Sequence, residues 1–271
     1  MSSHGLGLET DDWDVYDCEL DHQPVSILVN LSAILRAPAP DKPWLLRIAA
    51  QPRAARVATS NEVQQLAELR VLRKVVATVL KEGSPVDLVG CVKSHARLEL
   101  YYYANSTKGF EQIVENVRSR LLGHSIESRS ARDPQWTQYR EILYPSEVEM
   151  IQQIRNRRVL QQLDRNGDDH AVSRPVDHDI YFRTASDSAN FVRAAGELGF
   201  QARSGPLEQM QGKCERPFFV NMVRSDPVTS DHIASVVAQL ILLAARFDGK
   251  YDGWGCGVRT AGLEMLGHRR T

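Results

Sequence analysis

The chain has 271 residues, a length that fits two ordinary domains of roughly 100–150 residues each. Its hydrophobic fraction of 42% and charged fraction of 25% are those of an average globular protein, which excludes a disordered chain. The 33 Lys and Arg residues balance the 34 Asp and Glu residues, without separating into basic and acidic halves. This balance argues against a protein held on nucleic acid through its phosphates.

The cysteines lie far apart and form no CxxC pair; they are Cys18, Cys91, Cys214 and Cys256. We therefore expect reduced, mostly buried thiols rather than a zinc ribbon or a redox dithiol. The polar, acidic residues 1–12 lack the apolar segment of a secretory signal. The apolar stretch around Leu240 ends at Arg246, short of the ~20 apolar residues that a membrane span needs. A cytoplasmic location without a membrane partner is expected.

The first half of the chain begins with strand-like segments around Val15, over Pro24–Leu31 and over Trp44–Ile48. We expect the second and third of these strands to pair with each other. A capping-box pattern at Thr59–Glu62 then precedes an apolar stripe with helical spacing from Val63 to Val79. The stripe predicts a long amphipathic helix.

Two further strands and a helix follow in the first half. The apolar run Val86–Val92 and the alternating Arg97–Tyr103 flank a plausible turn, which predicts a hairpin. Helical spacing of apolar residues over Phe110–Leu121 predicts a helix, and Ser125–Ser130 predicts a last strand. This order suits an antiparallel sheet with helices packed on one face.

The second half repeats this alternation of strands and helices. Asp133–Pro145 is bracketed by prolines and predicts the joint between the halves. A capping box at Ser146–Glu149 predicts a helix that ends before Gly167. The remaining elements expected are a strand over Asp179–Arg183, a helix from Ser186 to Gly199, strands over Phe200–Arg203 and Phe218–Val223, and a helix from Asp231. The expected domains are residues 1–140 and 145–260, with a polar tail at 261–271.

The least generic string is Tyr251-Asp252-Gly253-Trp254, which follows an apolar helical run from Ile233 to Ala245. Over roughly residues 145–258 the chain resembles the regulator of ribonuclease E activity B family, a bacterial group. Besides this string, the residues that carry the likeness are Arg174, Val176, Asp177, His178, Tyr181, Phe182, Gly199 and Phe200. The resemblance implies a ferredoxin-like α+β fold and a function in binding and inhibiting that endoribonuclease. Unlike that small single-domain inhibitor, this chain has a large N-terminal domain and lacks its acidic stretch.

The first half is similar to an uncharacterised bacterial domain of unknown function that is often joined to this family. The likeness is carried by Trp13, Tyr16, the helix at Glu62, Tyr101–Tyr103 and the pattern Asp133-Pro134-x-Trp136-x-x-Tyr139. It implies no function. The predicted fold class is therefore α+β, with two domains that are each an antiparallel sheet with helices on one face, the C-terminal domain being ferredoxin-like.

Asp177-His178-Asp179 would suit metal binding or acid–base chemistry, because flanking carboxylates favour the imidazolium. However, alternation along a strand puts both carboxylates on the face opposite His178, and no further ligand lies at a short spacing. We therefore expect His178 to be half-buried and hydrogen-bonded to backbone.

Asp164–Asp169 has the residue types of a calcium loop, but its glycine comes too early and no glutamate closes it. A helix end capped by Gly167 is the favoured interpretation.

Two aromatic segments have both a functional and a structural interpretation. Tyr251, Asp252 and Trp254 could anchor a protein partner. Alternatively they form a structural turn with permissive glycine backbone, in which Trp254 covers the core edge, and this turn is favoured. Tyr101–Tyr103 could stack bases, but no basic residues accompany them.

Together these observations predict a regulator that acts through protein–protein contact and does not bind nucleic acid directly. Ribonuclease E, or another RNA-processing enzyme, is the partner that the resemblance implies. The candidate partner-binding or structural residues are Arg174, Asp177, His178, Tyr251, Asp252 and Trp254. No catalytic, metal-binding or cofactor-binding residue is predicted, and no cofactor. The alternative is a small-ligand-binding or enzymatic module with a site between the two domains, which a pocket of convergent ionisable side chains would favour.

Overall fold

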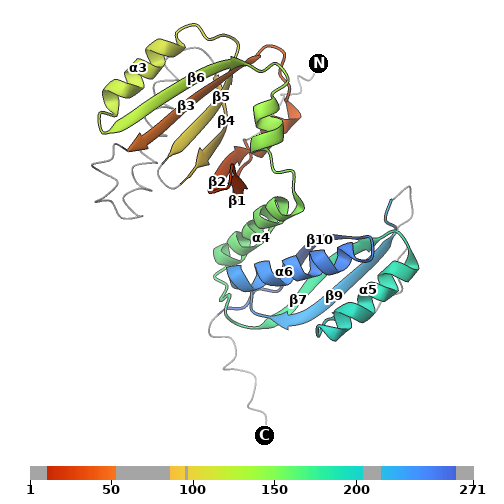
Figure 1. Ribbon diagram of the computed structural model, residues 1–271. Helices are drawn as coiled ribbons and strands as arrows, with labels where there is room; N and C mark the ends of the chain where they lie inside the picture. Colours follow the sequence, from red (N-terminus) through yellow and green to blue (C-terminus); the bar gives the residue numbers. More distant parts are fainter. Residues whose placement is uncertain (1–10, 53–85, 95–96, 204–214, 261–271) are drawn as a thin grey trace, which may run out of the picture. The chain divides into compact units, whose positions relative to one another are not determined.

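The computed structural model describes residues 11–52, 86–94, 97–203 and 215–260 (Figure 1). The chain forms two compact units, Met1–Met150 and Ile151–Thr271. Each unit contains one antiparallel sheet, which confirms the predicted α+β class with two such sheets. Within the described ranges, no helix has both the length and the apolar character needed to cross a membrane.

The sheet of the first unit has six strands in the order β1-β2-β4-β5-β3-β6. Their bounds are β1 (Trp13–Leu20), β2 (Gln23–Asn30), β3 (Trp44–Pro52), β4 (Val86–Lys93), β5 (Leu98–Ala104) and β6 (His124–Arg132), with the short helix η1 (Leu31–Leu35) after β2. The predicted hairpin is confirmed as β4–β5, and the predicted last strand as β6.

The predicted pairing of the second and third strands is wrong. β2 lies between β1 and β4, whereas β3 lies between β5 and β6. The physical reason is the tight turn at Asp21 and His22, whose φ angles of 50° and 60° suit the twist of a two-residue hairpin. This turn folds β2 back onto β1. The segment after η1 then carries the chain towards the opposite edge of the sheet, where β3 lies between β5 and β6.

One face of this sheet packs against α3 (Phe110–Arg120), which confirms the helix expected over Phe110–Leu121. The core on this face includes Ile48 and Leu100 from the sheet and Val114 from the helix. The helix predicted from the stripe Val63 to Val79 lies outside the described residues.

The segment predicted as the joint between the halves packs on the first unit's sheet. Trp136 is fully buried and stacks on Tyr103 at a ring-centroid distance of 4.1 Å. The π-helix η2 (Gln138–Leu143) follows, and the Tyr139 hydroxyl donates to the Asn30 carbonyl at 2.7 Å. Tyr101–Tyr103 are all buried, so they present no exposed ring face on which a base could stack.

The second unit contains the strand and helix order β-α-β-β-α-β that characterises the ferredoxin-like motif. After α4 (Val148–Arg165), the elements are β7 (Arg174–Phe182), α5 (Ala185–Glu197), β8 (Gln201–Ala202), β9 (Phe218–Asp226), α6 (Ser230–Ala245) and β10 (Gly249–Cys256). The antiparallel sheet has the order β10-β7-β9-β8. β7 begins at Arg174, earlier than predicted. α5 begins at Ala185 rather than at Ser186, and Thr184 is its N-cap, since the Thr184 hydroxyl accepts the Asp187 N–H at 3.1 Å.

The helices of the second unit cover one face of its sheet. Figure 1 shows α5 and α6 on the same side of β7, β9 and β10. The buried cluster on this side joins helix residues to alternate strand residues, among them Leu163, Phe191, Leu240, Val176 and Ile180. Period-two alternation therefore turns the other β7 residues, including Asp177 and Asp179, to the opposite, partly exposed face.

Candidate functional site

The six candidate residues lie on two neighbouring strands, β7 and β10. Trp254 is opposite His178, and Gly255 is opposite Asp177. Tyr251–Trp254 is thus an edge strand with a bulge between Tyr251 and Gly253, rather than the predicted turn. The chain reverses earlier, at Asp248, where φ is 49°.

His178 is fully buried and its Nδ1 lies 2.9 Å from the Tyr251 hydroxyl. Phe200 contacts the imidazole edge-on at a ring-centroid distance of 5.6 Å. Burial lowers the pKa of His178 to about 4, so the ring is neutral at pH 7. Among the described residues, its Nε2 has no hydrogen-bond partner. The half-buried, backbone-bonded histidine that we expected is therefore a core residue bonded to a tyrosine, whose own pKa burial raises.

Trp254 and Tyr251 are also core residues, with exposed fractions of 9% and 5%. The Trp254 indole N–H donates to Asn156 Oδ1 of α4 at 2.8 Å. From the adjacent position of α4, Arg155 donates to the carbonyl oxygen of Asp252 at the bulge. These contacts fix α4 against the edge strand. The two rings hold the fold together and form no exposed aromatic patch.

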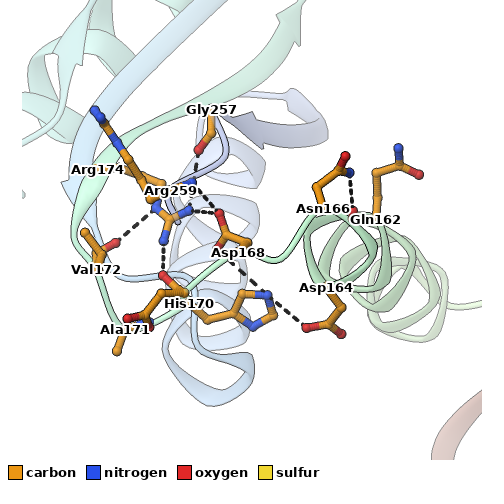
Figure 2. A network of polar contacts seen from close by, with 11 residues as sticks. Gln162, Asp164, Asn166, Asp168, His170, Ala171, Val172, Arg174, Gly257 and Arg259 are labelled. Atoms are coloured by element: carbon orange, nitrogen blue, oxygen red, sulfur yellow. Dashed lines mark hydrogen bonds and ion pairs between the residues drawn. The ribbon is translucent and has the colours of Figure 1, made fainter. Parts of the chain in front are cut away.

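Arg174 is the centre of a buried polar network (Figure 2). Its guanidinium donates to the Asp168 carboxylate and to the carbonyl oxygens of Val172 and Asp169. The backbone N–H of Arg259 donates to the same Asp168 carboxylate at 2.6 Å. Burial alone would raise the pKa of Asp168, but the Arg259 N–H and the Arg174 guanidinium outweigh it and lower that pKa. The network ties the loop after α4 to the chain leaving β10.

The acidic segment Asp164–Asp169 is a helix end, as predicted. Gly167 has a φ of 71°, and its N–H donates to the Asp164 carbonyl at 3.0 Å. Asp168 then turns inward to Arg174, whereas Asp164 lies 3.3 Å from His170 Nε2 (Figure 2). In the part of the chain that the structure describes, no group of three or more His, Cys, Asp or Glu side chains could hold a metal ion.

Sequence reasoning missed the arrangement on the opposite face of the sheet. There Tyr181 lies opposite Phe219, with ring centroids 5.2 Å apart. Asp179 accepts the Asn221 side-chain N–H at 2.7 Å. Asp177 forms an ion pair with Arg203 at 2.8 Å. The signal in the sequence was the period-two alternation of β7, but the partners depend on the register of β9.

This geometry defines an α+β protein of two units, the second with the order β-α-β-β-α-β. The candidate residues on β7 and β10, here called the signature residues, include buried side chains that stabilise the second unit. The sequence model of the family described as regulator of ribonuclease activity B matches residues 153–256. A second model, described as a family of unknown function (DUF695), matches residues 11–144. The chain thus carries one segment that is similar to the unknown-function family and another that is similar to the regulator of ribonuclease activity B family. The match to the latter supports regulation through a protein partner.

The solved structures include two distant likenesses. An unknown protein from Galdieria sulphuraria is 12% identical, with 80% of this chain and 99% of that chain covered and a TM-score of 0.22. A novel heme-binding protein from Thermus thermophilus is 13% identical, with coverages of 79% and 89% and a TM-score of 0.19. At such scores neither likeness carries an argument about fold or function. No curated protein matches the chain.

Proposed function

We propose that the protein regulates an endoribonuclease by binding to it, and that ribonuclease E is the partner. The observation that carries the proposal is the family match over residues 153–256, the same part of the chain in which the signature residues meet on β7 and β10. Such a regulator acts where RNA is processed, so the proposal includes a cytoplasmic location.

The chemistry of the signature residues supports binding rather than catalysis. His178 is neutral and lies in the core, and Asp168 is engaged by Arg174. These ionisable groups are thus used to build the second unit. The overall charge is balanced, with 33 basic and 34 acidic residues, so phosphate attraction does not favour RNA as the target. The enzyme, not its substrate, is the proposed partner.

A binding and inhibition assay with purified ribonuclease E tests this function. We expect saturable binding by biolayer interferometry and a cleavage rate of a fluorogenic RNA that falls in proportion to the fraction of enzyme bound. The protein alone should neither cleave that RNA nor shift it in a gel. Absence of binding to ribonuclease E, or tight RNA binding with a steep salt dependence, would contradict the proposal.

A further inference from the structure

The second unit's sheet has a face that points away from α4, α5 and α6, here called the open face. Cross-strand register sets Phe219 beside Tyr181, and places two glycines of β10 beside the two carboxylates of β7. The residues of the open face used below are Asp177, Asp179, Tyr181, Phe219, Gly253 and Gly255.

The bulge of β10 adjoins Gly253, whereas no such irregularity lies at Gly255, and the space above both residues is open. Neither Gly253 nor Gly255 has a positive φ, and a Cβ added at either would meet nothing within 4 Å among the described residues. Gly249 of the same strand differs, because a Cβ there would lie 2.3 Å from the Phe182 ring. Glycine in a strand gives up packing, and its common reasons are a bulge, as beside Gly253, and the close approach of another backbone, which is the one open to Gly255. Gly253 and Gly255 leave a bare strip of backbone on the edge strand.

The charges and rings beside this strip define what can lie on it. Within the described residues, Asp179 has one hydrogen bond, from Asn221, and a carboxylate offers about four acceptor positions. Asp177 is paired with Arg203, whose side chain is 64% exposed, and such solvated pairs contribute little. Lys250 comes from the edge strand β10 and Arg203 follows β8 at the opposite edge, whereas Asp177 and Asp179 lie on β7 between these edges and form an acidic centre.

The aromatic pair adjoins this acidic centre. Tyr181 is two residues from Asp179 on the same face, and its ring lies 5.2 Å from that of Phe219. A guanidinium can pair with a carboxylate and also stack on an aromatic ring. A phosphate, by contrast, would be repelled by the carboxylates and by the faces of the aromatic rings. An arginine side chain is therefore the complement of this surface.

We propose that the open face is the docking surface for an extended, arginine-bearing segment of the partner protein. Its backbone lies over Gly253 and Gly255, and its guanidinium binds Asp179 beside the Tyr181–Phe219 pair. The identity of the partner rests on the proposed function, whereas the surface itself can be tested without ribonuclease E.

The first test uses an acetylated, amidated Val-Arg-Val-Arg-Val peptide and the full ¹⁵N-labelled chain. We expect saturable shifts of the Gly253 and Gly255 amide resonances, and none with the matched peptide in which glutamate replaces arginine. The double variant Asp177→Asn and Asp179→Asn should bind at least about tenfold more weakly, because charge-assisted hydrogen bonds are lost. Glu197→Gln removes an exposed carboxylate of α5 and should bind like the original chain.

The sharpest variant is Gly255→Val, because the fold leaves the Cβ position open and a docked chain would occupy it. We expect an unchanged melting temperature and at least about tenfold weaker peptide binding, since the side chain occupies the space above the strip. Equal peptide affinity of Gly255→Val and the original chain overturns the proposal, as do peptide shifts that centre elsewhere.

Ribonuclease E then separates this inference from the proposed function. If the enzyme binds the original chain and Gly255→Val equally well, the docking surface is wrong although the proposed function holds. If the peptide binds the open face but ribonuclease E does not bind the original chain, the surface holds and the proposed function fails.

Discussion

Acid should destabilise the second unit at a pH where most carboxylates are still ionised, because His178 must remain neutral to stay buried. Its pKa is about 4 in the folded protein and about 6.5 in the unfolded chain. Between these values the unfolded chain binds the proton and the folded protein does not. The contribution of the neutral His178 to the stability of the second unit is therefore fully present above pH 6.5, and it is lost as the pH falls from 6.5 to 4.

The size of the effect follows from the difference between the two pKa values. Each pKa unit is worth about 1.4 kcal/mol, so this single histidine accounts for a loss of about 3 kcal/mol across the window. The buried Asp168 and Asp226 also have lowered pKa values, but such carboxylates lose their contribution below about pH 4. The two effects are thus separated along the pH axis.

Urea unfolding at closely spaced pH values, followed by the indole N–H resonance of Trp254, measures the loss in the second unit alone. His178→Asn is the matched variant, because its amide can replace Nδ1 as the partner of the Tyr251 hydroxyl. We expect this variant to be less stable at pH 7 but nearly independent of pH between 6.5 and 4. A wild-type stability that is flat in this window, or a variant that keeps the full slope, would refute the reasoning.

Three further predictions concern stability and domain structure. Trp254→Ala should cost about 3–5 kcal/mol, as truncation of a buried aromatic side chain does, and denaturant unfolding measures it. Arg174→Met should lower the free energy of unfolding by about 3–5 kcal/mol, because it leaves the Asp168 carboxylate buried without its cation. Adding Asp168→Leu should recover part of that loss, and a double variant as unstable as Arg174→Met would contradict this account. Limited proteolysis should release two folded pieces by cutting within residues 144–150; early cuts within the packed residues 133–143 would count against it.

Local sequence pattern predicted those elements whose periodicity is long or whose partner is adjacent in sequence. α3 and α6 carry helical apolar stripes, and the β4–β5 hairpin joins neighbouring segments. The pairing of β3 with β6 spans most of the first unit and leaves no trace in local spacing. The packing of Trp136 on Tyr103 is hidden for the same reason, so Asp133–Pro145 read as a joint.

The candidate site was predicted in part. Its residues were known from the family likeness, and the structure brings all of them onto β7 and β10. Asp168, the buried partner of Arg174, was missed because a carboxylate after a helix C-cap is usually solvated. Phe219 was missed because its place beside Tyr181 requires the register of β9. Local composition specifies neither of these contacts.

The residues that carry the family likeness divide into two groups once their surroundings are known. Arg174, His178 and Trp254 are buried, and their contacts within the second unit account for them. Asp177 is on the open face, where the core does not use its carboxylate. A residue that the fold does not require needs a cause outside the fold. The docking proposed for the open face would supply that cause, so we expect substitutions there to change the partner's affinity while leaving the unfolding free energy nearly unchanged.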